Sequence, residues 1–230
     1  SVLQPLNLCT GCYMKSIPPE VDVSQITIRQ KKVFPQYLFI LMEFCENTLQ
    51  EAVSNCHGDH DVVWSYFAQC VQGLAHLHSK RVIHRDVKPN NIFVHKGVVK
   101  IGDLGLARNS SIPAKSVVSD LSFESECKSS EVGTFLYTAP EVSTGKYNEK
   151  CDIFSLGVVL VEIFSDFTTG MERADVLSKL RTSATLPDKW VKTHLIQAQL
   201  ARKMVVPDPS SRPSCSHILG ELLSEGLWQQ

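Results

Sequence analysis

The most informative part of the sequence is VIHRDVKPNN, residues 82–91. It places a carboxylate at Asp86, an ammonium at Lys88 and an amide at Asn91 within one short segment. A carboxylate can accept a proton, an ammonium can neutralise a phosphate, and an amide oxygen can hold a metal ion. Taken singly, each is also a common turn or capping residue, so the meaning of the stretch depends on its surroundings.

Regular elements are predicted on both sides of this stretch. Apolar residues recur every three or four positions over residues 61–80, which predicts an amphipathic helix with Asp59 or Asp61 as its N-cap. On the other side, the strand-forming runs 92–94 and 98–101 flank a turn-like sequence and predict a β-hairpin. A helix, a polar loop and a hairpin therefore follow one another.

Farther along the chain the pattern changes twice. Residues 109–130 include eight serines and show no hydrophobic periodicity, so we expect a mobile loop. Beyond it the apolar spacing becomes helical, and a bundle of helices is predicted for the C-terminal half. The expected helices span residues 151–164, 171–181, 191–204 and 213–224.

The beginning of the chain is different in character. Four prolines and little periodicity predict a long loop over residues 1–36, whereas Tyr37–Met42 is an apolar run typical of a buried strand. Cys9 and Cys12 form a C-x-x-C pair that could bind zinc or act in redox chemistry, but no second pair completes four zinc ligands. A metal site there is therefore disfavoured.

Composition excludes several functional classes. The 230 residues are 43% hydrophobic and carry 24 acidic against 23 basic side chains, a net charge of -1. This balance lacks the basic excess that nucleic-acid binding requires, so no nucleic-acid site is expected. No apolar run is long enough to predict a membrane segment. The eight scattered cysteines favour reduced thiols and a cytoplasmic protein.

Further motifs follow in a fixed order after residues 82–91. They are Asp103-Leu104-Gly105, Ala139-Pro140-Glu141 and the sequence CDIFSLG at residues 151–157. Together with HRDVKPNN they resemble the ordered motifs of the protein kinase family. The resemblance implies an α+β fold of the protein kinase type.

The resemblance also divides the chain. Residues 37–230 would be the hinge strand and the mostly α-helical C-terminal lobe, with an activation segment at 103–141. Residues 1–36 would be a loop or insertion remaining from an N-terminal lobe that is incomplete.

In kinases these motifs bind ATP and Mg²⁺ and transfer a phosphoryl group. The resemblance implies that Asp86 orients the attacking hydroxyl and accepts its proton, and that Lys88 neutralises the transferring phosphate. Asn91 and Asp103 would hold magnesium. Gly105 would supply the backbone freedom for the turn after Asp103.

The same register places the nucleotide base at the hinge. Met42 would guard the back of the pocket, the backbone of Glu43 and Cys45 would hold the adenine edge, and Phe93 would form part of the floor. Cys45 as a reactive nucleophile is an alternative interpretation.

Two residue sets are expected to support the site. In the family the Glu of A-P-E pairs with a late Arg, so Glu141 and Arg212 would form a buried ion pair. Asp152 would accept hydrogen bonds from the backbone of residues 82–91.

Arg85 suggests control by phosphorylation, because its guanidinium can receive an anion. Ser129, Ser130 and Thr134 are the candidate phosphosites. The alternative for Thr134 is that its hydroxyl only bonds Asp86 and Lys88.

Three segments indicate the branch of the family. Residues 131–141, 150–160 and 170–181 resemble the kinases of the alpha subunit of translation initiation factor 2, of the haem-regulated or amino-acid-starvation type. The resemblance implies Ser/Thr specificity, this subunit as substrate, and down-regulation of translation under stress. Thr169 and Glu172 would start a substrate-docking helix, although helix capping alone would explain both residues.

Two family motifs do not occur in the sequence. None of the 12 glycines forms G-x-G-x-x-G, and no V-A-x-K precedes Met42. These motifs clamp ATP in kinases, so we expect the isolated chain to be inactive. Kinases of this kind could pair as homodimers through the N-terminal lobe. The competing hypothesis is a truncated, kinase-like binding or dimerisation module without catalysis.

Overall fold

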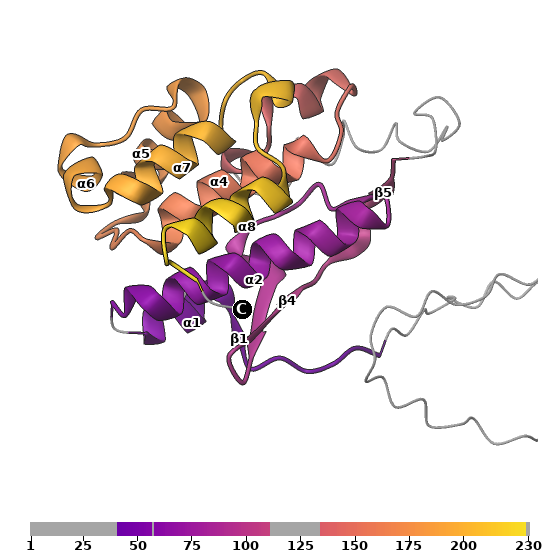
Figure 1. Cartoon of the computed structure of the whole chain (residues 1–230), viewed down its shortest axis with the longest axis horizontal. Coiled ribbons are helices and arrows are strands. Elements are labelled where there is room, and N and C mark those ends of the chain that lie inside the picture. Colours follow the sequence, from indigo (N-terminus) through magenta and orange to yellow (C-terminus); the bar gives the residue numbers. More distant parts are fainter. Residues whose placement is uncertain (1–40, 57, 111–133, 229–230) are drawn as a thin grey trace, which may run out of the picture. The chain divides into compact units, whose positions relative to one another are not determined.

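The computed structural model describes residues 41–56, 58–110 and 134–228 (Figure 1). The chain divides into two units, residues 1–44 and residues 45–230. In the first unit, Leu41 and Met42 lie in neither a helix nor a strand. The prediction of a strand over Tyr37–Met42 is therefore wrong for these two residues, and the others lie outside the described residues.

The second unit is mostly helical. Its α-helices are α1 (Leu49–Asn55), α2 (His60–Ser79), α4 (Lys150–Ile163), α5 (Gly170–Ser183), α6 (Asp188–Thr193), α7 (Leu195–Met204) and α8 (Cys215–Ser224). Its strands are β1 (Asn47–Thr48), β2 (Val82–Ile83), β3 (Ile92–His95), β4 (Val98–Ile101) and β5 (Arg108–Asn109). The combination confirms the α+β kinase-like class predicted from the motifs.

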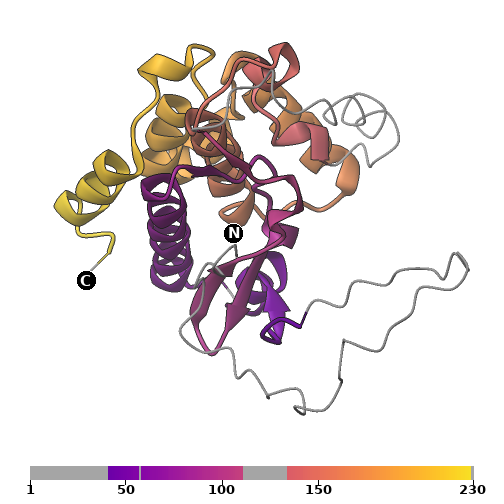
Figure 2. The same cartoon turned by 90° about the vertical axis from the view of Figure 1, so that its right-hand side faces the viewer.

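Helix α2 forms where the periodicity predicts it, and its cap decides between the two candidates. The Asp59 carboxylate accepts hydrogen bonds from the backbone N–H groups of Asp61 at 3.1 Å and Val62 at 3.3 Å. Asp59 is therefore the N-cap. The apolar stripe of α2, which includes Phe67 and Val71, is buried. Figures 1 and 2 show α8 lying alongside this helix.

Strands β3 and β4 form the predicted antiparallel hairpin. Lys96 and Gly97 turn the chain with φ angles of 50° and 76°. Two left-handed residues give the turn that matches the twist of a tight hairpin. Strand β1 adds to its edge in the order β1-β3-β4. The hairpin is confirmed, while the two-residue strand β1 was not predicted.

A second, small antiparallel pair joins β2 to β5. Val82 pairs with Asn109 and Ile83 pairs with Arg108. Asn109 therefore lies in a strand and not in the loop predicted to begin there, because its backbone pairs across the sequence with β2. Residues 111–130 of that predicted loop lie outside the described residues. The pairing fixes the chain on both sides of the segment 84–107.

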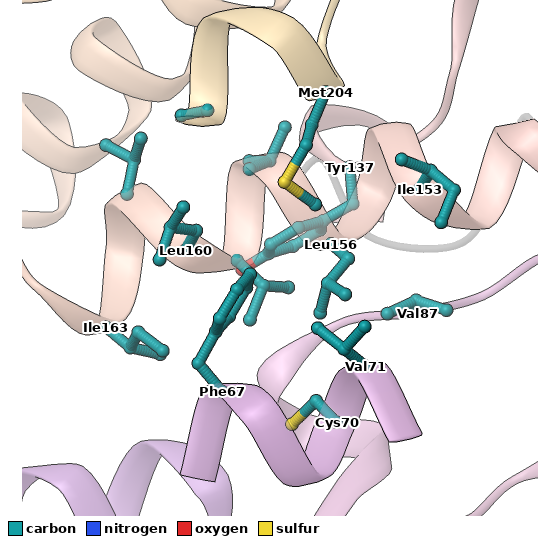
Figure 3. Packing of buried hydrophobic residues seen from close by; sticks show 14 of the residues in the cluster. Phe67, Cys70, Val71, Val87, Tyr137, Ile153, Leu156, Leu160, Ile163 and Met204 are labelled. Atoms are coloured by element: carbon teal, nitrogen blue, oxygen red, sulfur yellow. The ribbon is translucent and has the colours of Figure 1, made fainter. Parts of the chain in front are cut away.

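The core is centred on α4. Every residue from Cys151 to Ile163 is buried, as the apolar run predicts. Phe67 and Val71 of α2 point toward Leu156 and Leu160 of α4, and Met204 of α7 packs from the opposite side (Figure 3). A helix apolar on all sides must be covered on all sides, so α4 is the scaffold for the neighbouring elements.

The single helix predicted over residues 191–204 is two helices. His194 has φ −130° and ψ 53°, which is not helical, and it separates α6 from α7. Its ring stacks on Trp190 with centroids 4.8 Å apart. The ring also lies near the distant His60 and Phe164, with centroids 5.6 Å and 6.3 Å away. Tertiary packing of the His194 ring therefore overrides the local periodicity. Within the part of the chain that is described, no helix is both long and apolar enough to span a bilayer.

Candidate active site

The polar loop after β2 is held by a carboxylate from the central helix. Asp152, fully buried at the start of α4, accepts hydrogen bonds from the backbone N–H groups of His84 and Arg85, each at 2.8 Å. Nε2 of His78 lies 2.9 Å from the same carboxylate. The contacts that the resemblance implies for Asp152 are therefore present.

The loop adopts a backbone conformation that needs this support. Arg85 has a φ of 72°, in the left-handed region that is unfavourable for a side chain with a Cβ atom. Its guanidinium lies 5.3 Å from the centroid of the Tyr147 ring. The two amide hydrogen bonds to Asp152 hold the strained residue in place.

Asp86, Lys88 and Asn91 are brought together in this loop. The side-chain nitrogen of Asn91 donates to Oδ2 of Asp86 at 2.7 Å and to its backbone oxygen at 2.9 Å. Nζ of Lys88 lies 3.0 Å from the same Oδ2. Val87 and Pro89 are buried and anchor the loop between these polar residues. The Asn91 amide and the Lys88 ammonium therefore contact the same carboxylate oxygen and together orient it.

Gly102, the residue before Asp103, contacts this loop because the hairpin returns to it. The N–H of Gly102 donates to the backbone oxygen of Asn91 at 2.9 Å, and His84 Nε2 lies 2.8 Å from the Gly102 oxygen. Asp103 itself is exposed. Two hydrogen bonds thus hold the residue preceding Asp103 against the loop of Asp86.

The turn at Asp103 differs from the prediction. Asp103 has a φ of 56°, whereas Gly105 is not left-handed. The prediction that Gly105 supplies the backbone freedom is therefore wrong, since Asp103 itself adopts the left-handed conformation. Aspartate tolerates this region better than most residues because its short side chain bonds locally, here to the N–H of Gly105 at 3.4 Å.

The predicted nucleotide-binding residues are placed unequally. The ring of Phe93 packs against Gly102, where an added Cβ would lie 2.6 Å from a ring carbon. Phe93 therefore lies beside the residue that precedes Asp103. Met42 and Glu43 belong to the first unit and Cys45 to the second, so the hinge remains a prediction.

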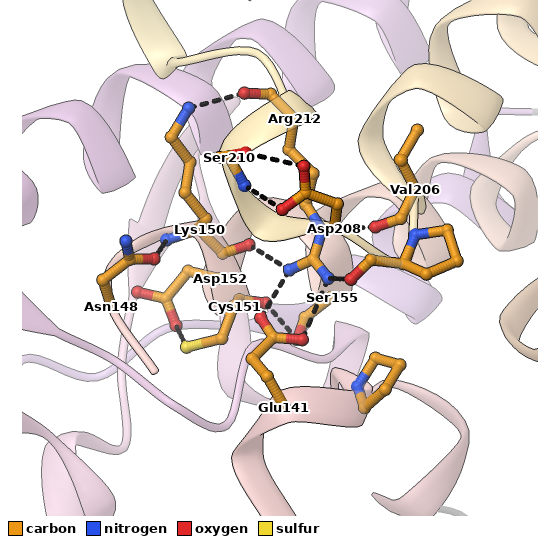
Figure 4. Close-up of polar contacts among 12 residues, drawn as sticks. Glu141, Asn148, Lys150, Cys151, Asp152, Ser155, Val206, Asp208, Ser210 and Arg212 are labelled. Carbon is orange, nitrogen blue, oxygen red and sulfur yellow. Dashed lines mark hydrogen bonds and ion pairs between the residues drawn. The ribbon is translucent and has the colours of Figure 1, made fainter. Parts of the chain in front are cut away.

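Glu141 and Arg212 form a bidentate ion pair (Figure 4). The two guanidinium nitrogens donate to the two carboxylate oxygens at 2.5 Å and 2.9 Å. The Arg212 side chain is fully enclosed and also donates to the backbone oxygens of Val206, Lys150 and Pro207. The pair joins the end of the predicted activation segment to the segment before α8.

The candidate docking residues are part of a helix cap. The Thr169 hydroxyl accepts a hydrogen bond from the N–H of Glu172 at 3.1 Å, so Thr169 is the N-cap of α5. The Glu172 carboxylate accepts from the N–H and the hydroxyl of Thr168, at 2.9 Å and 2.8 Å. These bonds lower the pKa of Glu172. The capping interpretation of both residues is therefore present in the structure.

Two of the three candidate phosphosites, Ser129 and Ser130, lie outside the described residues. The third, Thr134, begins the 3₁₀ helix η6 (Thr134–Leu136), and the structure describes only the backbone of this residue.

One buried polar network was not predicted. The Tyr137 hydroxyl donates to the Glu162 carboxylate. The Arg173 guanidinium donates to the Glu162 carboxylate and to the Tyr137 hydroxyl, each at 2.5 Å. Burial raises the pKa of Tyr137, and the Glu162 charge raises it further. The sequence contains an indication of this network, because Glu162 interrupts an apolar run and a buried carboxylate requires partners. This network ties α5 to α4 and to the chain just before Glu141.

The residues at the loop are suited to a magnesium ion. Asn91 uses its amide nitrogen for both hydrogen bonds described above, which leaves its oxygen for a cation. Asp103, which follows the Gly102 that is bonded to the Asn91 backbone, is exposed. Mg²⁺ is usually held by one or two protein oxygens together with phosphates and water. Among the described residues, no group of three or more His, Cys, Asp or Glu could hold a metal ion.

Comparison with known proteins identifies what this arrangement resembles. Residues 20–223 match the family model of the protein kinase domain. The chain is 41% identical over 193 residues to the eIF-2-alpha kinase GCN2 of Arabidopsis thaliana. It is 33% identical over 215 residues to the probable serine/threonine-protein kinase ifkB of Dictyostelium discoideum. It is 38% identical over 161 residues to the mouse eukaryotic translation initiation factor 2-alpha kinase 1.

These alignments cover most of this chain but little of the relatives. They include 80%, 79% and 69% of the chain, in the same order. They span 15%, 16% and 26% of the relatives' own lengths.

Proposed function

The chain belongs to the protein kinase family. We propose that it is the C-terminal lobe of a serine/threonine kinase that phosphorylates the alpha subunit of translation initiation factor 2. The observation that carries the proposal is the convergence of Asp86, Lys88 and Asn91 on a loop held by Asp152. A carboxylate, an ammonium and an amide in this arrangement suit transfer of a phosphoryl group to a hydroxyl.

Each side chain has a defined role in the proposed reaction. Asp86 accepts the proton of the substrate hydroxyl while the hydroxyl oxygen forms a bond to the γ-phosphorus of ATP. The bond between that phosphorus and the oxygen of the β-phosphate breaks, and ADP leaves. Asn91 orients the Asp86 carboxylate through the 2.7 Å hydrogen bond. Lys88 lies 3.0 Å from that carboxylate and is placed to neutralise charge on the transferring phosphate.

Asn91 and Asp103 are the proposed magnesium ligands. When bound, the ion neutralises charge that develops on the phosphate oxygens. The hydrogen bonds of Gly102 to the backbone oxygen of Asn91 and to the ring of His84 support this pairing, because Gly102 directly precedes Asp103. The adenine would lie against the hinge of Met42, Glu43 and Cys45, with Phe93 below it.

The choice of substrate rests on the three segments near residues 131–141, 150–160 and 170–181 and on the names of the relatives. Two of the relatives are named as kinases of the initiation factor alpha subunit. We expect the substrate to dock at the start of α5, near Thr169 and Glu172, where Met171 is 84% exposed. Phosphorylation of the initiation factor subunit would reduce translation under stress. The reaction would take place in the cytoplasm. Two copies of the kinase could pair as a homodimer through an N-terminal lobe.

Control by phosphorylation is proposed at Ser129, Ser130 or Thr134. Arg85 is the expected receiver of the added phosphate, because it is cationic and directly precedes Asp86. A phosphate held there would link the segment between Asp103 and Glu141 to the loop of Asp86.

The experiment supplies an ATP-clamping lobe and asks whether transfer follows. Residues 41–230 are joined behind the N-terminal lobe of the Arabidopsis relative, and the joined kinase is incubated with ATP, Mg²⁺ and the initiation factor alpha subunit. We expect serine phosphorylation by the joined kinase and none by the 230-residue chain alone. A folded joined kinase without transfer to any protein would contradict the proposal and favour a binding module. Robust transfer by the chain alone would contradict the need for the clamp.

A further inference from the structure

A second chain of contacts reaches the catalytic loop from the far side of Asp152. Sγ of Cys215, the first residue of α8, lies 3.6 Å from Nδ1 of His78 in α2. Nε2 of His78 lies 2.9 Å from Oδ2 of Asp152 in α4. The same carboxylate holds the amides of His84 and Arg85. Three helices therefore contribute one side chain each to a continuous path that ends at the loop.

The partners of the imidazole ring determine where its protons lie. The Asp152 carboxylate already accepts two backbone N–H groups at 2.8 Å, so it acts as an acceptor. Nε2 of His78 must therefore carry a proton, because two lone pairs at 2.9 Å would repel each other. In a neutral ring the other nitrogen, Nδ1, is then an acceptor. The group that faces Nδ1 is the thiol of Cys215, which can donate its S–H.

We propose that Cys215 is a positioning residue for the catalytic loop. Its S–H donates to Nδ1 of His78 and keeps the ring as the neutral tautomer that donates Nε2–H to Asp152. Through Asp152, this arrangement fixes the backbone of His84 and Arg85 beside Asp86. The consequence for phosphoryl transfer rests on the proposed function, whereas the arrangement of protons is inferred from the contacts of a neutral ring and does not depend on that function.

Two other interpretations of this cluster fail on chemical grounds. A nucleophilic cysteine needs a thiolate, but burial raises the pKa of Cys215 to about 12, and the Asp152 charge raises it further. A metal centre would need deprotonated thiols and free carboxylate oxygens. Burial also raises the pKa of Cys151, which contacts Asp152, and the carboxylate oxygens are occupied by N–H donors.

The first test reads the ring directly. Long-range ¹H–¹⁵N NMR spectra of the full 230-residue chain at neutral pH report which nitrogens of His78 are protonated. We expect a protonated Nε2 and an unprotonated Nδ1. Protonation of both nitrogens, or of Nδ1 alone, would overturn the proposal, because the thiol would then not be the donor.

The second test asks whether Cys215 acts on the loop. Amide hydrogen exchange of His84 and Arg85 is compared in Cys215→Ala and in Cys70→Ala, the matched control. Cys70 is likewise buried with a pKa raised by burial to about 12, and it lies in α2.

We expect exchange roughly threefold faster at these two amides in Cys215→Ala alone, the effect of one weak hydrogen bond. Unchanged exchange in Cys215→Ala, or equal acceleration in both variants, would overturn the proposal. Neither measurement requires phosphoryl transfer, so an inactive kinase would leave this inference standing.

Discussion

Arg212 satisfies every donor of its guanidinium within the protein. A guanidinium has five N–H groups, and Arg212 makes five hydrogen bonds, two of them to Glu141. Its plane also lies over the Phe154 ring, 4.9 Å from the centroid. A charge enclosed in this way depends on its partner, because loss of one member leaves the other charge buried without compensation.

Replacing Arg212 alone is therefore expected to be costly. Arg212→Met leaves the Glu141 carboxylate without its partner and should lower the free energy of unfolding by roughly 3–5 kcal/mol. The measurement is urea unfolding followed by circular dichroism. The control is the double variant Glu141→Met/Arg212→Met, which removes both charges and should be more stable than Arg212→Met. A single variant within about 1 kcal/mol of the parent would contradict the assignment.

At the scale of elements, the close approach of α4 and α7 depends on Gly157. A Cβ atom added at Gly157 would lie 2.8 Å from Cβ of Met204 and 3.0 Å from a methyl carbon of Val205. Both contacts are shorter than side chains normally make, and the Met204 atom is attached directly to the backbone. The two helices can pack at this distance because one of them lacks a side chain.

Two glycine substitutions separate packing from helix propensity. Gly157→Ala should destabilise the protein by about 1–2 kcal/mol, because overpacking outweighs the better propensity of alanine. Gly220→Ala, in the exposed middle of α8 with nothing within 4 Å of the added Cβ, should stabilise it by about 0.5–1 kcal/mol. Thermal unfolding measures both. Equal shifts of the two variants in the same direction would refute the packing argument.

The break between α6 and α7 is expected to make stability depend on pH. Burial lowers the pKa of His194 from its ordinary value and nearby His60 lowers it further, while the backbone of Trp190 and the charge of Asp166 oppose this. When the folded state has the lower pKa, the unfolded chain binds more protons as the solution is acidified. The contribution of His194 is therefore complete above about pH 6.5 and declines as the pH falls through the lower folded value.

Chemical unfolding at a series of pH values checks this expectation. Between about pH 7 and pH 5, the free energy of unfolding should fall less steeply in His194→Gln than in the parent chain. His217→Gln, on the exposed surface of α8, serves as the control with the same substitution. Identical slopes in His194→Gln and the parent would show that the ring contributes nothing to the pH dependence.

The local pattern of apolar residues correctly predicted the long helices and the hairpin. It did not predict the features that arise where segments distant in the sequence meet. Helices α2, α4, α5 and α8 follow from apolar periodicity, and the hairpin follows from two strand-forming runs. The two-residue strands β1, β2 and β5 exist only through pairing across the sequence, which no local window contains. The break at His194 arises in the same way, from ring packing.

The site shows the same division. The positions of Asp86, Lys88 and Asn91 on one loop follow from their spacing, and the pairing of Glu141 with Arg212 follows from the family motifs. The left-handed conformation of Asp103 could not be predicted, because aspartate is only permitted in this region and the preceding Gly102 is held by Asn91 and His84, which are distant in the sequence. The contact of Cys215 with His78 joins residues from two distant helices and has no signature in the sequence.

Asp86 is proposed as the catalytic carboxylate of the kinase lobe. This role is measured by the turnover number of the joined kinase on the initiation factor alpha subunit, comparing Asp86→Asn with the exposed control Asp61→Asn. We expect a loss on the order of 10²–10⁴-fold for Asp86→Asn at similar KM, and a turnover within about twofold of the parent for Asp61→Asn. An Asp86→Asn variant that is folded and retains the parent turnover would contradict this role.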